Sequence, residues 1–146
     1  MEPEEFEEEL DRCGKRGEPL TRKRRGDLLQ KWRQVYAAPL HKKTGKWKHG
    51  QFEWHVFSFK HTRALDGGRA EEAYKQERPG PLIVIPEDVA FPAYELTARQ
   101  LPSFTAVSGD VYLWPPDYAW TMAFTHEASD GLGPYFSRRE WAISAP

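Results

Sequence analysis

The sequence predicts a single α+β domain with a mixed, mostly antiparallel sheet of about five strands and two main helices packed on one face. Two kinds of pattern favour this class. Short segments alternate apolar and polar residues, as strands do, and longer segments place apolar residues at helical spacing. The chain has 146 residues, which is enough for one domain with a sizeable core.

A charged arm is expected at residues 1–26, ahead of a single domain at residues 27–146. In the arm a cluster of acidic residues precedes a cluster of basic residues, and interior glycines and a proline interrupt helical structure. Phe6 and Leu10 form a sparse apolar pair at helical spacing. We therefore expect a short N-terminal helix and then a loose, solvated linker that is dispensable for folding.

Helices are expected at two places in the domain. Asp27 is a suitable N-cap for a helix over Leu28–Ala37, where apolar residues recur at helical spacing before Pro39. A second, more exposed helix is predicted over Arg69–Glu77, directly after the turn residues Asp66-Gly67-Gly68.

Strands account for most of the remaining regular structure. The unbroken apolar run Leu82–Ile85 lies between prolines and is typical of a short central strand that is buried on both faces. Alternation of side chains also predicts strands at Gln51–Phe59 and Asp110–Trp114.

A hairpin near the C-terminus carries much of the polar chemistry. The segment Ala119–His126 alternates as a strand with His126 at its end, and glycines and a proline follow it as turn signals. We expect the chain to double back so that Tyr135–Arg138 pairs antiparallel with this strand. Asp130 and Tyr135 would then lie at the same hairpin end as His126.

The adjacent residues His126 and Glu127 are the candidate acid–base pair. A zinc helix of the H-E-x-x-H kind would need a second histidine where this chain has Asp130, so that motif is absent. On a strand the two side chains face opposite sides, and they could share a site only at a bulge or turn. The alternative is that His126 is a structural histidine, hydrogen-bonded at the strand end.

His55 is a second candidate for catalysis or metal binding. If its strand lies beside Ala119–His126, the rings of His55 and His126 could converge with Glu53 or Asp130 on a metal ion or a substrate. Histidines without ligand spacing more often satisfy polar groups of the core, and we expect no cofactor.

Four residues are candidate binding residues: Trp47, Asp130, Tyr135 and Arg138. Trp47 lies in a lysine-rich loop between His41 and Gly50, which suggests phosphate contacts and base stacking. The net charge of -1 gives no overall attraction for nucleic acid, so a solvated loop is the favoured interpretation.

Four short blocks carry a resemblance to a known family: Trp54-His55-Val56-Phe57-Ser58, Trp120-Thr121, Thr125-His126-Glu127 and Gly133-Pro134-Tyr135-Phe136. In this order they resemble an uncharacterised bacterial family with a domain of unknown function, typified by small YdfR-like proteins. The resemblance covers about Asp27 to Arg138 and implies no particular activity, because that family has no assigned function.

Composition narrows the classes of function. The single cysteine, Cys13, excludes an internal disulfide and a cysteine-rich zinc site, in agreement with a reducing compartment. No apolar run approaches the roughly 20 residues that span a bilayer, and the acidic start is unlike a signal peptide. We expect a cytoplasmic protein without membrane contact, as a monomer or a weak homodimer.

Aromatic residues make up 14% of the chain, and its charges are segregated along the sequence, which suits recognition better than chemistry. Our interpretation is a non-catalytic protein-binding domain, for example an inhibitor or an immunity-type partner of a toxin; the example is an analogy of size and architecture. The alternative is a small metal-dependent or acid–base hydrolase that uses His55, His126 and Glu127. A further alternative is a nucleic-acid-binding accessory protein.

Overall fold

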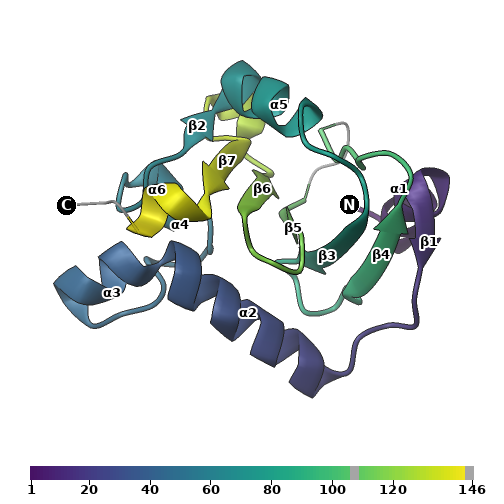
Figure 1. Cartoon of the computed structure of the whole chain (residues 1–146), viewed down its shortest axis with the longest axis horizontal. Helices are drawn as coiled ribbons and strands as arrows, with labels where there is room; N and C mark the ends of the chain where they lie inside the picture. Colours follow the sequence, from purple (N-terminus) through teal and green to yellow (C-terminus); the bar gives the residue numbers. More distant parts are fainter. Residues whose placement is uncertain (106–108, 144–146) are drawn as a thin grey trace.

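In the computed structural model, which describes residues 1–105 and 109–143, seven strands form one antiparallel sheet with helices on both faces (Figure 1). The strand order is β1-β4-β3-β5-β6-β7-β2, and all neighbouring strands are antiparallel. The strands are β1 (Gly14–Arg16), β2 (Leu65–Asp66), β3 (Pro81–Pro86), β4 (Tyr94–Ala98), β5 (Val111–Trp114), β6 (Trp120–Phe124) and β7 (Tyr135–Arg138).

Six α-helices and one short 3-10 helix are present among the described residues. They are α1 (Pro3–Cys13), α2 (Arg22–Tyr36), α3 (Ala38–Thr44), α4 (His55–Ser58), α5 (Gly67–Lys75), α6 (Arg139–Ile143) and the 3-10 turn η1 (Ala128–Asp130). The mixed α and β class is therefore confirmed, but the sheet is larger than the five strands expected and the helices are more numerous.

The two main helices lie on opposite faces of the sheet, which corrects the expectation that both cover one face. Leu28, Trp32 and Tyr36 of α2 belong to one buried cluster, together with residues of α3 and α4. Ala70 and Tyr74 of α5 belong to the other, together with residues of α1. Figure 1 shows α2 and α5 on either side of the strands.

The central strands explain why both faces need helices. Ile83 and Ile85 of β3 point into the first cluster, whereas Leu82 and Val84 point into the second. All four are at most 3% exposed, so the expectation of a central strand buried on both faces is confirmed.

The C-terminal hairpin has the expected pairing. Met122 of β6 lies opposite Phe136 of β7, and Ala123 lies opposite Tyr135. Trp120, at the start of β6, is 5% exposed and stacks on Phe136 with ring centroids 5.9 Å apart.

The strand expected at Gln51–Phe59 is wrong, because this segment forms turns and the short helix α4. Val56 and Phe57 are consecutive and both buried, a pattern that an alternating strand with one exposed face does not allow. Trp54 and Phe57 are three residues apart and both belong to the first cluster, as on one face of a helical turn. Aromatic residues occupy so many positions of this segment that its apolar residues fit a strand period as well as a helical one.

The N-terminal segment, expected to be a solvated arm, packs against the sheet. Phe6, Leu10 and Cys13 of α1 are fully buried. Strand β1 pairs with β4, and a Cβ atom on Gly14 would lie 2.2 Å from the Thr97 carbonyl oxygen, so only glycine permits this approach. The arm's opposite charges pair with each other, for example Arg16 with Glu7 at 2.9 Å.

The boundary expected after residue 26 falls inside α2. This helix begins at Arg22 because the Thr21 hydroxyl accepts a hydrogen bond from the Arg24 amide at 3.1 Å and caps the first turn. It continues through Asp27, the residue expected to be the N-cap. The residues between β1 and α2, expected to be a loose linker, are attached to the β4 segment, because the Gly17 amide donates to the Glu95 carbonyl at 2.9 Å and the Leu20 amide to the Ala93 carbonyl at 2.8 Å.

We predict that Phe6→Ala lowers the free energy of unfolding by about 3–5 kcal/mol, because it removes a fully buried ring from the cluster between α1 and the sheet. Urea unfolding measures the change. Glu8→Ala, at an exposed position of α1, is the matched control and should change stability by less than about 0.5 kcal/mol. A Phe6→Ala protein as stable as the control would mean that α1 is dispensable, as the sequence alone suggested.

Candidate functional site

The Asp110 carboxylate joins three groups at one end of the β5–β6 hairpin. His126 Nδ1 lies 2.9 Å from both oxygens of Asp110, and the His126 amide donates to Oδ1 at 2.9 Å. The indole N–H of Trp54 donates to the same oxygen at 3.1 Å. The pairing of Val111 with Phe124 brings these residues together, because Asp110 precedes β5 and His126 follows β6. Asp110 therefore fixes the histidine ring and connects the hairpin to the segment before α4.

His126 and Glu127 lie in a turn rather than on the strand itself, so their side chains approach each other. Glu127 Oε1 lies 3.6 Å from His126 Nε2, and both side chains are about a third exposed. The Asp110 carboxylate on Nδ1 orients the ring and leaves Nε2, beside Glu127, as the nitrogen that can accept a proton, as in a general base with its orienting group. The arrangement has the chemical capacity for proton transfer.

A cavity of about 490 Å³ lies beside this histidine. The rings of Phe52 and Phe91 form apolar parts of its wall, and Glu87, Asp110 and His126 supply polar groups. The Phe52 ring meets His126 edge to face, with centroids 5.0 Å apart. The cavity combines aromatic surface with carboxylates, which is the composition of many small-molecule sites.

Glu87 connects the cavity to the interior. Its Oε1 accepts hydrogen bonds from the Tyr112 hydroxyl at 2.7 Å and from the Glu53 amide at 2.9 Å. Burial raises the pKa of the Glu87 carboxyl above its ordinary value. Glu53, a candidate to converge with His55 and His126 on a ligand, instead receives two hydrogen bonds from Arg33, at 2.9 and 2.8 Å, and its side chain is 2% exposed. Glu53 therefore serves an internal ion pair.

His55 lies on α4, and its ring meets the neighbouring rings at tilted or edge-on angles. Its Nδ1 is 3.0 Å from the Ser58 hydroxyl oxygen, and its ring centroid is 4.3 Å from that of Trp54. Burial, and next the charge of His49, lower the pKa of His55. Within residues 1–105 and 109–143, no three His, Cys, Asp or Glu side chains are grouped as metal ligands, so the structure offers His55 and His126 no such group.

The four residues expected to bind a partner do not gather in one place. Tyr135 and Arg138 occupy opposite ends of β7; Tyr135 is 5% exposed, and Arg138 pairs with Glu77 at 3.0 Å. Trp47 stacks on His41 with centroids 3.8 Å apart, and Asp130 is exposed in η1.

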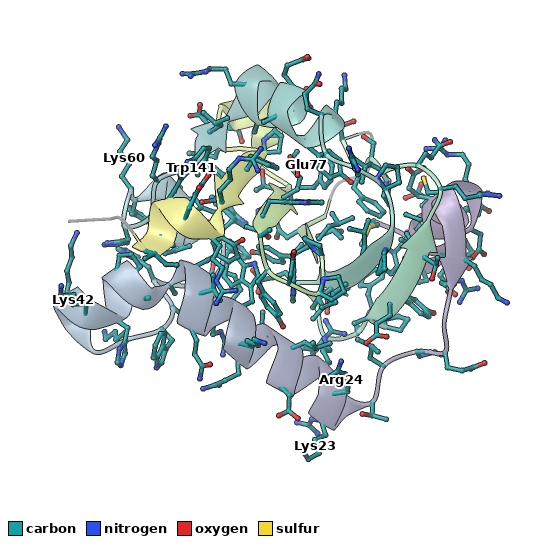
Figure 2. The ribbon with its side chains drawn as sticks, viewed as in Figure 1. Lys23, Arg24, Lys42, Lys60, Glu77 and Trp141 are labelled. Carbon is teal, nitrogen blue, oxygen red and sulfur yellow. The ribbon has the colours of Figure 1, made fainter. Side chains whose placement is uncertain are left out.

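A basic surface lies around α3 and the loop after α4. Residues 28–65 contain eight lysines and arginines but one acidic residue, Glu53, although the whole chain has a net charge of -1. Five of these cations are exposed and form no ion pair with any described residue: Lys42, Lys43, Lys46, Lys60 and Arg63. We call these five residues the basic surface. Figure 2 shows Lys42 and Lys60 at the same side of the molecule.

Aromatic contacts join the two parts of the basic surface. Phe59, which is 55% exposed, stacks on His49 with centroids 4.1 Å apart and planes within 8°. The charge of Lys43 on α3 contributes to lowering the pKa of His61, after burial and His49. The loop before α4 contacts α3 through the stacking of Trp47 on His41 and contacts the segment that carries Phe59 through His49. A count of charges between Asp27 and Asp66 could have revealed this surface from the sequence.

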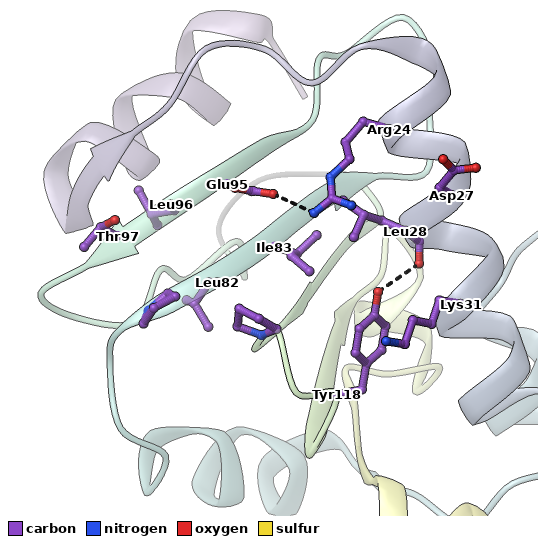
Figure 3. A pocket seen from close by; sticks show the side chains of 12 residues that line it. Arg24, Asp27, Leu28, Lys31, Leu82, Ile83, Glu95, Leu96, Thr97 and Tyr118 are labelled. Atoms are coloured by element: carbon purple, nitrogen blue, oxygen red, sulfur yellow. Dashed lines mark hydrogen bonds and ion pairs between the residues drawn. The ribbon is translucent and has the colours of Figure 1, made fainter.

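A second groove, also of about 490 Å³, lies between α2 and strands β3 and β4 (Figure 3). Its charged groups already have partners. Arg24 lies 3.2 Å from Glu95, and Lys31 lies over the Tyr118 ring, 4.9 Å from its centroid. The Tyr118 hydroxyl donates to the Leu28 carbonyl at 3.4 Å. These contacts connect the helix to the sheet, which is a structural role.

Cys13 is the single cysteine of the chain, and its side chain is buried. Burial raises the pKa of the Cys13 thiol to about 11, so the thiolate that a nucleophilic cysteine requires is disfavoured. Within the part of the chain that the structure describes, no helix is long and apolar enough to cross a membrane.

We predict that His55 makes the fold sensitive to acid. Its pKa is lowered in the folded state, so its contribution to stability is present above the ordinary value of 6.5 and is lost as the pH falls below it. Between pH 7.5 and pH 5.5 the parent should therefore lose more stability than His55→Gln. Urea unfolding at both pH values measures this, and equal losses in the two proteins would contradict it.

Comparison with known proteins agrees with the resemblance noted from the short sequence blocks. No curated protein and no solved structure is significantly similar to the chain. Residues 23–136 match the pattern of a family described as a domain of unknown function (DUF4275), and the expectation of an uncharacterised family is confirmed. Because the match covers most of the 146 residues, the chain belongs to the DUF4275 family.

Proposed function

We propose that this chain is a non-catalytic protein-binding domain that engages an acidic partner through the basic surface. One observation carries the proposal: residues 42–63 contain five exposed cations without an ion-pair partner among the described residues, and the same segment carries the exposed ring of Phe59. Unpaired cations attract an acidic partner and steer its approach. An exposed aromatic side chain close to such cations can serve as the anchor of a protein interface.

The anchor is held in place before binding. Phe59 lies almost parallel to the His49 ring at 4.1 Å, so less side-chain freedom is lost when a partner covers it. The one acidic residue of this region, Glu53, does not cancel the surface charge, because it is buried and already paired with Arg33 and Lys48. The surface therefore keeps its positive charge although the chain as a whole is slightly negative.

A protein partner is favoured over nucleic acid. The ring most suited to stack on a base, Trp47, already stacks on His41 at 3.8 Å. An inhibitor or an immunity-type partner of a toxin remains the example that size and architecture suggest, with a cytoplasmic location.

We predict that Lys42→Glu, Lys43→Glu and Lys60→Glu together abolish capture of the partner. The measurement is affinity capture from the native host, with mass spectrometry of the retained proteins. The control variant carries Lys15→Glu, Arg22→Glu and Lys75→Glu, which make the same charge change at exposed positions elsewhere. Proteins retained by the parent and the control but lost from the first variant would be the expected result.

Two outcomes would contradict the proposal. If both variants retain the same proteins as the parent, the basic surface is not the binding face. If nuclease treatment removes the proteins that the parent captures, the nucleic-acid alternative is supported instead. Phe59→Ala should weaken capture without changing net charge, which separates a specific interface from simple charge attraction.

The alternative, a small acid–base hydrolase, is favoured by one specific geometry. Asp110 lies 2.9 Å from Nδ1 of His126, Glu127 lies 3.6 Å from Nε2, and the cavity of about 490 Å³ adjoins them. These contacts do not require catalysis, because the hydrogen bonds between Asp110 and His126 and between Asp110 and Trp54 also hold the hairpin and Trp54 in place. The same contacts therefore have a sufficient structural explanation.

Substitutions of the pair distinguish these two interpretations. If His126 is structural, His126→Ala removes its hydrogen bonding to Asp110 and should lower the free energy of unfolding by about 1–2 kcal/mol. Glu127→Ala, at an exposed turn, should be neutral within about 0.5 kcal/mol. Thermal unfolding measures both. A His126→Ala protein as stable as the parent, together with loss of hydrolysis of simple esters or phosphoesters by both variants, would favour the enzyme.

A further inference from the structure

Two imidazole nitrogens face each other in the loops beside Phe59. His49 Nδ1 and His61 Nε2 are 2.8 Å apart, and the ring centroids are 5.0 Å apart. His49 precedes α4 by a few residues, and His61 follows it in the next turn. Neither residue belongs to the Asp110–His126 site. At this distance at least one of the two facing nitrogens must offer a lone pair.

The spacing is close to that of two ligands on one transition-metal ion. Metal–nitrogen bonds of about 2.0–2.1 Å place two nitrogens about 2.9–3.4 Å apart for bond angles between a right angle and the tetrahedral value. The observed 2.8 Å is shorter by a few tenths of an ångström. Small rotations of two rings in surface loops would open the pair enough to admit an ion.

Both rings are held in position by groups that are not ligands. His49 stacks on Phe59 at 4.1 Å, and the His61 amide donates to the Val56 carbonyl at 3.0 Å. Lys60, directly before His61, has a φ of 60°, a left-handed conformation that is unusual for a residue with a side chain. This conformation turns the chain after α4 so that His61 comes back toward His49. Such supporting contacts pre-organise ligands.

We propose that His49 and His61 are two ligands of a divalent transition-metal ion of the class that prefers imidazole, such as Zn²⁺, Ni²⁺ or Cu²⁺. Both side chains are partly exposed, so the remaining positions of the ion are open. Within the described residues no group of three His, Cys, Asp or Glu ligands exists, so water or a carboxylate from outside the chain completes the coordination. This site goes beyond the proposed function and does not depend on it.

The test uses Cu²⁺ and Zn²⁺ as probes on the full chain without an affinity tag. Titration calorimetry with Zn²⁺ should give one ion per chain, and His49→Gln or His61→Gln should each weaken binding at least tenfold. His41→Gln is the matched control, because His41 stacks on Trp47 and faces no other histidine in the described part of the chain. It should bind like the parent.

A spectroscopic measurement on the parent does not depend on the folding of any variant. Electron paramagnetic resonance of the one-to-one Cu²⁺ complex should show hyperfine coupling to nitrogens of two imidazoles. Coupling to fewer than two imidazoles would overturn the proposal. So would equal Zn²⁺ affinity of the parent and the His49→Gln, His61→Gln double variant, which would mean that the pair is a hydrogen bond only. Equal weakening by His41→Gln would also overturn it, because binding would then be unspecific.

Discussion

The fold depends on one constraint: the central strands are apolar on both faces and must be covered on both. Ile83 and Ile85 face one cluster, while Leu82 and Val84 face the other, and β5 divides its side chains in the same way. A sheet of this kind is stable only as the middle layer of three. Helices α2, α3 and α4 cover one face of the sheet. Helix α5 and the N-terminal helix α1 cover the other face, which is why the N-terminal segment is part of the core although it has few apolar residues.

The same layers position the polar sites. The β5–β6 hairpin brings Asp110 to His126, and the packing of Trp54 against the sheet adds its indole N–H to the same carboxylate. Asp110 resembles the orienting acid of a catalytic histidine, yet it also connects three parts of the fold. An arrangement that a structural role explains completely is weak support for catalysis, and for this reason recognition is the function that we favour.

In residues 28–65 the single acidic side chain is buried, whereas five of the lysines and arginines are exposed. Glu53 is buried with Arg33, so residues 28–65 contribute little negative charge to their own surface. The exposed lysines of α3 and its loop lie in the same region of the chain as Phe59, and the stacking partner of Phe59, His49, also faces His61. A binding surface and a proposed ion site therefore share one small set of loops. They are independent hypotheses, because one concerns the exposed cations and the other concerns two ring nitrogens.

By itself the sequence determined the elements whose signal is local: the central strand at Leu82–Ile85, the hairpin from Ala119 to Arg138 and most of α2. Their apolar residues recur with a clear period, and periodicity is a property of neighbours along the chain. Only the tertiary structure decided the short edge strands β1 and β2, the packing of Phe6 and the helical form of α4. It alone also decided the approach of His49 to His61 and of Asp110 to His126. The physical reason is that these features are stabilised by contacts between segments distant in sequence, which leave no period in either segment.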